Sequence, residues 1–305
     1  AGAEGDTARA AARAALAGIA QPLDFYGLLA AEELGQPFQL PAAAAAPGAA
    51  EREAVRGQPG LARALQLIQL GLRSEGVREW NFTLRGMPER ELLAAAQWAC
   101  EAAVWDRCIN TSDRTRTEID VTQRYPLAFR EPILETARAT GLDPAVLFGL
   151  IRQESRFITD ARSGVGASGL MQLMPATARW TAKKIGLDFK PGMVNDPQVN
   201  LQLGAAYLRR VLDDFDGSLA MATAAYNAGP GRPRRWREGG AVMEPAAWAE
   251  SIPFNETRDY VQKVLANSVA YAALLGAPAP SLKARLGAAI GPRAPDAATP
   301  DRDLP

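Results

Sequence analysis

The sequence predicts an all-helical protein made of two successive helical regions. Apolar residues recur at helical spacing between glycine and proline breaks, whereas no run of β-branched residues alternates as it would in a strand. The chain has 305 residues, and one domain usually takes roughly 150. We therefore expect two folded regions and little or no sheet.

The first region is expected to consist of stacked helix hairpins. Short helical segments separated by glycine or proline follow one another from residue 61 to 112. The polar stretch "DRTRTEIDVTQRYP" then ends at Pro126, and it predicts a boundary between a hairpin region over 1–124 and a second helical domain over 125–275. Residues 276–305 are so rich in proline that we expect them to be mostly disordered.

The composition limits the chemistry that is open to this chain. Histidine is absent, which excludes Ser-His and Cys-His nucleophiles, and two cysteines are too few for a structural zinc site. Basic and acidic residues both number 34, so no overall field attracts nucleic acid. We expect no metal, no cofactor, no nucleic-acid partner and no transmembrane segment, and acid–base chemistry must fall to carboxylates, tyrosines or lysines.

The two cysteines, Cys100 and Cys108, allow two interpretations. In one continuous helix they would lie about 12 Å apart, which is too far for a disulfide. A turn near Glu101 to Ala103 would bring them together. Two free, packed thiols and a disulfide therefore both remain open.

Glu154 stands in "GLIRQESRF", between two arginines in the sequence. Asp143 can cap this helix and Pro144 suits its first turn, so the helix should run through Ser155. The neighbours of Glu154 on its own helix face are the residues three and four positions away, and all are apolar: Leu150, Ile151, Phe157 and Ile158.

Two roles fit a carboxylate that continues an apolar stripe. Burial would raise its pKa and favour the protonated form that a general acid needs. It could instead be a structural glutamate that pairs with an arginine or amide from another helix. The helix alone leaves both roles open.

"GVGASG", residues 164–169, matches a dinucleotide-binding pattern in letters only. That pattern needs a preceding strand, and here the Glu154 helix precedes it. We interpret the segment as a flexible loop whose glycines let backbone approach a ligand.

Three further segments offer polar groups or charge. Gln172 stands between two methionines in "GLMQLMPATARW", where Pro175 should open a helix that Gly186 closes. "LAMATAAYNAGPGR" predicts a small-residue helix that ends with Tyr226 and Asn227. The following arginine cluster is expected to be a solvated basic loop, with contact to an acidic polymer as the alternative: Arg232, Arg234, Arg235 and Arg237.

Taken together, "IRQESRF", "SGVGASGLMQLMPATA", "AAYNAGPGR" and "SIPFNETRDYV" resemble, in order and spacing, the catalytic domain of soluble lytic transglycosylases from the Gram-negative periplasm. The resemblance covers about Tyr125 to Leu275. It extends more weakly upstream, where the hairpins are similar to the linker region of those enzymes. Most of their long N-terminal superhelix has no counterpart here.

The resemblance implies a goose-lysozyme-like catalytic domain that cleaves the β-1,4 bond between MurNAc and GlcNAc in peptidoglycan and leaves 1,6-anhydro-MurNAc. It implies a periplasmic location, glycan strands as the binding partner, and Glu154 as the sole acid and base. It also implies a glycan cleft lined by Ser163, Gln172, Met174, Tyr226, Asn227, Glu256 and Tyr260, with Tyr226 orienting the glutamate.

A lone carboxyl group is chemically sufficient if the sugar's own 6-hydroxyl attacks C1, because no second group must then activate water. A goose-type muramidase on the same fold and a non-catalytic glycan-binding scaffold are the alternatives.

Overall fold

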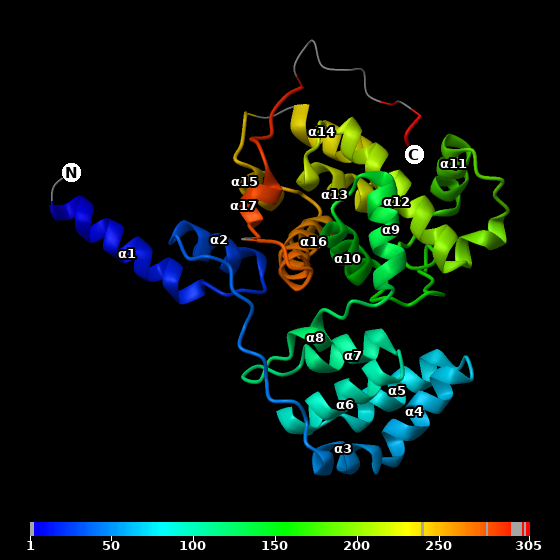
Figure 1. Cartoon of the computed structure of the whole chain (residues 1–305). Coiled ribbons are helices and arrows are strands. Elements are labelled where there is room, and N and C mark those ends of the chain that lie inside the picture. The colour runs from blue at the N-terminus through cyan, green and yellow to red at the C-terminus, as the bar shows by residue number, and fades with distance from the viewer. Residues whose placement is uncertain (1–2, 239–240, 279, 294–300, 302) are drawn as a thin grey trace. The chain divides into compact units, whose positions relative to one another are not determined.

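The computed structural model describes the chain apart from residues 1–2, 239–240, 279, 294–300 and 302. Helices dominate the described residues, where strand pairing is limited to three isolated β-bridges, so the all-helical prediction is confirmed. The chain divides into two compact units, whose helices are labelled in Figure 1. Unit 1 comprises Ala1–Gln39, Arg130–Ser155 and Thr159–Pro305, and unit 2 comprises Leu40–Phe129 and Arg156–Ile158.

Unit 2 is a set of short helices around one apolar core. Trp80 is fully buried at its centre, and its indole N–H donates to the buried hydroxyl of Thr111 at 2.9 Å. The helices are α3 (Ala49–Arg56), α4 (Pro59–Gln69), α5 (Arg73–Thr83), α6 (Glu89–Glu101), α7 (Trp105–Ser112) and α8 (Val121–Arg124). The last of them lies inside the stretch that the sequence predicts as a polar connector.

A disulfide joins Cys100 in α6 to Cys108 in α7. The two helices are separated by a turn in which Ala103 has a φ of 54°, and this turn brings the two Cα atoms to 5.0 Å. Of the two interpretations that the sequence left open, the structure has the disulfide.

Unit 1 contains the remaining helices. They are α1 (Ala3–Ile19), α2 (Phe25–Glu33), α9 (Arg130–Thr140), α10 (Pro144–Glu154), α11 (Pro175–Ile185), the 3-10 helix η1 (Pro191–Asn195), α12 (Pro197–Asp214), α13 (Leu219–Ala228), α14 (Gly231–Glu238), α15 (Pro245–Glu250), α16 (Asn255–Leu274) and α17 (Leu282–Leu286). Helices α10 and α16 pack side by side in the middle of this unit (Figure 1).

Close contact between α10 and α16 depends on Gly149. A Cβ atom at this position would lie 2.9 Å from the carbonyl oxygen of Val264 and 3.1 Å from the amide nitrogen of Ser268, both in α16. Glycine therefore lets the two backbones approach. The ring of Phe148, the residue before Gly149 in α10, stacks on the ring of Tyr271 in α16, with centroids 5.0 Å apart.

The sequence grouped residues 1–39 with the hairpins, but in the structure they belong to unit 1. The Glu32 carboxylate in α2 caps the N-terminus of α17, where it accepts hydrogen bonds from the backbone N–H groups of Leu282 at 2.5 Å and Lys283 at 3.1 Å. These partners are about 250 positions apart in the sequence. No local pattern could have revealed their contact.

The expectation of disorder over residues 276–305 is wrong for part of this tail. Residues 282–286 form α17, whose Leu282 and Leu286 are buried. Ile290 pairs with Met243 in an isolated antiparallel bridge. Residues 279, 294–300 and 302 of the tail lie outside the described residues.

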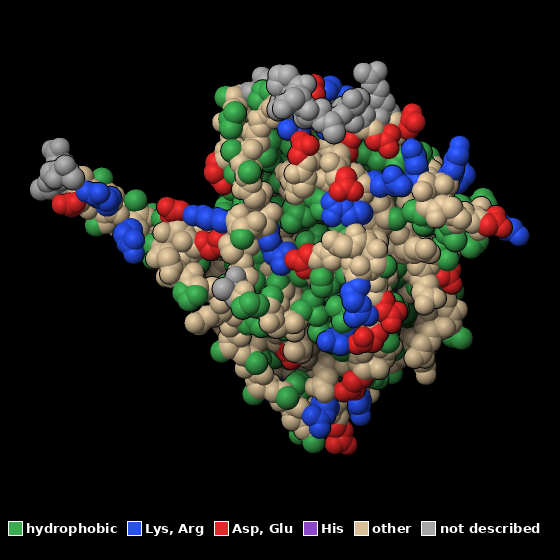
Figure 2. Space-filling model, turned by 45° about the horizontal axis from the view of Figure 1, so that its top comes forward, with side chains coloured by type: hydrophobic (Ala, Val, Ile, Leu, Met, Phe, Trp, Pro, Cys, Tyr) green, Lys and Arg blue, Asp and Glu red, His purple; other side chains and the backbone are tan. Residues whose placement is uncertain are grey.

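No helix among the described residues is both long and apolar enough to cross a lipid bilayer. On the face shown in Figure 2, basic and acidic side chains are intermixed, in line with equal totals of 34 each.

Candidate active site

Glu154 is the last residue of α10. The predicted start of this helix is confirmed, because the Asp143 carboxylate accepts the N–H of Ala145 at 2.8 Å and Pro144 is the first helical residue. The helix ends one residue earlier than predicted. Ser155 is its C-cap, and the two residues after it have left-handed backbone conformations, with φ of 49° at Arg156 and 65° at Phe157.

The carboxyl group of Glu154 meets a tyrosine instead of a cation. Leu150 and Ile151 are fully buried beside it, as the helical spacing predicts, and Glu154 itself is half-buried. The hydroxyl of Tyr260, in α16, donates a hydrogen bond of 2.5 Å to Oε1 of Glu154. No lysine or arginine in the described part of the chain forms an ion pair with this carboxylate.

Burial raises the pKa of Glu154 to about 8, because a desolvated carboxylate is disfavoured. The hydrogen bond from Tyr260 lowers this pKa and the negative charge of Glu256 raises it, and both effects are smaller than that of burial. At neutral pH most molecules therefore hold a protonated Glu154.

Tyr226 does not orient the glutamate. Its hydroxyl donates to the backbone carbonyl of Met171 at 2.8 Å, and Tyr260 makes the contact to Glu154 that we expected of Tyr226. Tyr226 nevertheless lies close enough for the charge of Glu154 to contribute, after burial, to a tyrosine pKa well above its usual value. Through its bond to Met171, Tyr226 supports the loop over residues 161–174.

The loop over residues 161–174 folds back on itself. Two isolated antiparallel bridges pair Ser168 with Arg162 and with Leu173. The side-chain amide of Gln172 donates to the carbonyls of Ala161 at 3.0 Å and Gly169 at 2.8 Å, and the Ser163 hydroxyl accepts the N–H of Ala167 at 2.9 Å. Gln172 and Ser163 therefore hold the loop in shape with these groups.

Asn200 anchors this loop, and sequence reasoning missed it. This fully buried side chain accepts the N–H of Met171 at 2.8 Å and donates to the carbonyls of Ser168 and Val194, both at 2.9 Å. Gly169 has a φ of 80°, and a Cβ there would lie 2.3 Å from the Asn200 amide nitrogen. The sequence analysis interpreted the glycines of this loop as positions where backbone approaches a ligand. At Gly169, the close packing against Asn200 is what requires glycine.

The other three predicted residues differ in their surroundings. Asn227 accepts a hydrogen bond of 2.7 Å from the buried hydroxyl of Thr257, which ties α13 to α16. Met174 is 41% exposed at the start of α11, and Glu256 is exposed in the first turn of α16. Thr257 lies three residues before Tyr260, and a search for polar residues on that helix face would have found it.

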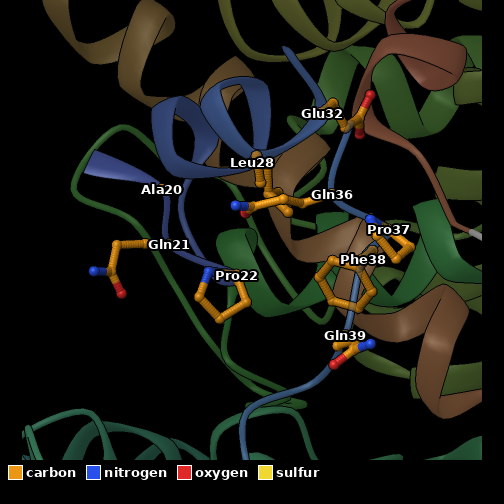
Figure 3. Close-up of a pocket in the computed structure, with 10 residues that line it drawn as sticks. Ala20, Gln21, Pro22, Leu28, Glu32, Gln36, Pro37, Phe38 and Gln39 are labelled. Carbon is orange, nitrogen blue, oxygen red and sulfur yellow. The ribbon is translucent and has the colours of Figure 1, made fainter. Parts of the chain in front are cut away.

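A well-formed pocket of unit 1 lies elsewhere. It has a volume of about 390 Å³ and is formed by α2 with the segments on either side of it, including Pro22, Leu28 and Phe38 (Figure 3). None of the predicted site residues lines it. Among the described residues, no group of three or more histidine, cysteine, aspartate or glutamate side chains could hold a metal ion.

Three family models match this chain. The Transglycosylase SLT domain matches residues 131–246, which include Glu154, the loop and Tyr226. The Soluble lytic murein transglycosylase L domain matches residues 54–117, and the Soluble lytic transglycosylase helical domain matches residues 251–279.

Several known proteins are similar to this chain over most of its length. The soluble lytic murein transglycosylase of Salmonella typhimurium is 33% identical over 270 residues, which are 88% of this chain and 42% of that protein. The structure of an inactive glutamate-to-glutamine mutant of the lytic transglycosylase Slt from Pseudomonas aeruginosa is 39% identical, with a TM-score of 0.81, and the match covers 88% of this chain and 44% of that one. The 70-kDa soluble lytic transglycosylase of Escherichia coli is 31% identical with a TM-score of 0.80, over 91% of this chain and 45% of that one. The chain thus spans less than half the length of these relatives.

Proposed function

Because this chain belongs to the soluble lytic transglycosylase family, we propose that it cleaves the β-1,4 bond between MurNAc and GlcNAc in peptidoglycan and leaves a 1,6-anhydro-MurNAc end. The observation that carries this proposal is the Glu154 carboxyl group, half-buried beside Tyr260 with no ion-pair partner among the described residues. The inactive Pseudomonas relative carries a glutamate-to-glutamine substitution, and we assign the corresponding role here to Glu154.

The reaction needs only one acid–base group. The Tyr260 hydroxyl donates a hydrogen bond to Oε1 of Glu154, so in this proposal the other oxygen, Oε2, carries the acidic proton. Glu154 gives this proton to the glycosidic oxygen as the bond from that oxygen to C1 of MurNAc breaks. The MurNAc 6-hydroxyl then forms a new bond to C1, and its proton passes to the Glu154 carboxylate, which is restored for the next turnover.

The remaining predicted residues are proposed to bind the glycan around this centre. Tyr260 positions the glutamate, and Met174 offers an exposed apolar face to a sugar ring. Glu256 contributes negative charge near Glu154. The other four hold the surrounding loop and helices in place through their hydrogen bonds, namely Ser163, Gln172, Tyr226 and Asn227.

We also propose that the protein acts in the periplasm. Its substrate is found there, and the Cys100–Cys108 disulfide suits an oxidising compartment. A catalytic domain over 125–275 remains our prediction for the functional boundary.

The products decide between this reaction and hydrolysis. Sacculi digested with the protein should release muropeptides with 1,6-anhydro ends, whose mass is one water lower, about 18 units, because the internal hydroxyl has a higher effective concentration than water. Separation of the muropeptides followed by mass spectrometry gives the answer. Predominantly hydrated, reducing MurNAc ends would instead identify a goose-type muramidase.

A further inference from the structure

Two features of unit 1 take no part in the proposed reaction. The first is the arginine cluster, which forms helix α14 and not the loop that the sequence predicts. Arg234 pairs with the buried Asp214 at 2.7 Å, and Arg237 pairs with Asp216 at 3.0 Å, so these two charges are neutralised within the unit. The second feature is the pocket beside α2, whose lining indicates a particular kind of ligand.

This pocket, which we call the α2 pocket, lies between α2 and the segments over residues 20–22 and 36–39. In Figure 3, the side chain of Leu28 lies above the rings of Pro22 and Phe38. All three line the pocket, and Leu28 is buried. The volume of about 390 Å³ is within the usual range of ligand pockets, roughly 300–1,000 Å³. The α2 pocket therefore offers apolar surface to a small ligand.

Two glycines fix the walls of the α2 pocket. A Cβ atom at Gly27 would lie 2.5 Å from the backbone nitrogen and oxygen of Gln21, so glycine is what lets the first segment pack on the helix. Gly35, with a φ of 73°, follows the end of α2 and turns the chain back. The N–H of Gln36 then donates to the carbonyl of Ala31 at 2.9 Å. The walls are thus held by contacts within the protein and do not need a ligand to form them.

Three glutamines supply the polar groups of the α2 pocket. The side-chain amides of Gln21, Gln36 and Gln39 line it, and they make no hydrogen bond with any residue that the structure describes. Figure 3 shows the Gln36 side chain running beneath Leu28. Each amide has two N–H donors and one carbonyl acceptor. The pocket therefore presents free donors and free acceptors together.

The described residues that line the α2 pocket offer no cation, and their one charged group is already bonded. The Glu32 carboxylate accepts hydrogen bonds from the hydroxyl of Ser281 at 2.9 Å and from the backbone N–H groups of Leu282 and Lys283. A ligand that brought a carboxylate into this pocket would lose water without gaining a counter-charge, which is costly. The lining thus favours an uncharged ligand that has both donors and acceptors.

We propose that the α2 pocket binds an N-acetylglucosamine unit of a glycan strand, as a second glycan site without a catalytic group. This inference rests on the proposed function, which supplies the strand. N-acetylglucosamine is uncharged, and its hydroxyl and acetamido groups match the free glutamine amides. Phe38, Pro22 and Pro37 would cover the C–H faces of the sugar. A strand held at this pocket stays close to the protein after a cut, because two linked sites raise the effective concentration of the substrate.

Nuclear magnetic resonance of the inactive protein tests this proposal. In a Glu154→Gln background labelled with ¹⁵N-glutamine, Gln21→Ala and Gln36→Ala each remove, and so identify, one side-chain amide signal. Titration with tri-N-acetylchitotriose should shift both signals to saturation. Cellotriose has the same β-1,4-linked glucose backbone without acetamido groups, and we expect its Kd to be at least about threefold higher.

A variant shows whether these signals report on the pocket itself. Gln36→Ala should raise the chitotriose Kd that is read from the Gln21 signal at least about threefold, because the ligand loses hydrogen bonds. Gln69→Ala is the matched control: it removes an exposed glutamine at the end of α4 in unit 2, and it should leave this Kd unchanged. If Gln36→Ala does not fold, Gln39→Ala takes its place with the same expected rise.

The outcomes separate this inference from the proposed function. Unshifted glutamine signals, equal Kd values for the two sugars, or a Kd that the pocket variant leaves unchanged would each overturn the inference. The proposed function is tested independently, by release of anhydro-muropeptides from sacculi by the protein with Glu154 intact. Release without sugar binding at the α2 pocket overturns the inference alone, and absence of release counts against the proposed function even if the pocket binds chitotriose.

Discussion

Asp106 in unit 2 and Glu154 in unit 1 both place a carboxyl group against an apolar core, but their partners differ. Asp106 is 3% exposed and forms ion pairs with Arg73 and with Arg107, the latter at 2.9 Å. Glu154 receives one hydrogen bond, from the neutral hydroxyl of Tyr260.

This difference distinguishes a structural carboxylate from a reactive one. A buried charge is normally compensated by a charge of opposite sign, because the cost of desolvation is large. At Asp106 the compensation is present, and its ion pair with Arg73 fastens α7 to α5. At Glu154 the described residues offer no such cation, and desolvation raises the pKa of the carboxyl group to about 8, so the group holds its proton at neutral pH. The structural role that the sequence left open for Glu154 needed an arginine or amide partner from another helix. The structure gives arginine partners to Asp106, and it gives Glu154 the hydroxyl of Tyr260.

The largest expected effect is on catalysis. Glu154→Gln keeps the size of the side chain but removes the transferable proton, so turnover of peptidoglycan should fall by about 10² to 10⁴ while the circular dichroism stays native. Initial rates of muropeptide release from sacculi measure the loss. Full activity in a folded variant would show that Glu154 is not the acid.

The matching change in unit 2 should affect stability. Asp106→Asn leaves the buried Arg107 without its carboxylate, and breaking a buried ion pair costs about 3–5 kcal/mol of unfolding free energy. Urea denaturation followed by tryptophan fluorescence reports this loss. The folded fraction should keep its catalytic rate within about twofold. A large rate loss without destabilisation would remove the contrast between the two carboxyl groups.

Tyr260→Phe should produce a smaller change in rate and a shift in pH dependence. We expect about a fivefold lower kcat, since one hydrogen bond is typically worth about 1 kcal/mol. The hydrogen bond from Tyr260 lowers the pKa of Glu154, so without it that pKa should rise and the alkaline fall in kcat should move to higher pH. Profiles of kcat against pH for both proteins test this. A shift to lower pH would contradict the proposed role of the hydroxyl.

Local sequence signals were sufficient for the helix that carries Glu154. Asp143 and Pro144 marked its start, and Leu150 and Ile151, four and three positions before Glu154, marked the buried side of the glutamate. Helical periodicity is a property of neighbouring residues, so a single segment reveals it. Helical spacing also showed that Cys100 and Cys108 could pair only if a turn separated them, so this turn was predicted as one of two possibilities.

Contacts between distant segments could not be predicted in this way. Tyr260 reaches Glu154 only because Gly149 lets α10 and α16 approach, and these residues lie more than a hundred positions from Tyr260. The anchoring of the 161–174 loop by Asn200 likewise spans 29 positions to Met171. Helical spacing says which side of a helix is apolar, but it does not say which other helix covers that side.

The protonation state of Glu154 tests the central claim most directly. The side-chain carboxyl carbon of glutamate can be followed by ¹³C NMR in labelled protein from pH 4 to 10, and Glu154→Gln identifies the signal that belongs to this residue. We predict a midpoint near pH 8, with the group protonated below it. A midpoint near the ordinary glutamate value of 4.5 would mean that Glu154 is ionised at neutral pH, and it would contradict the assignment of this residue as the general acid.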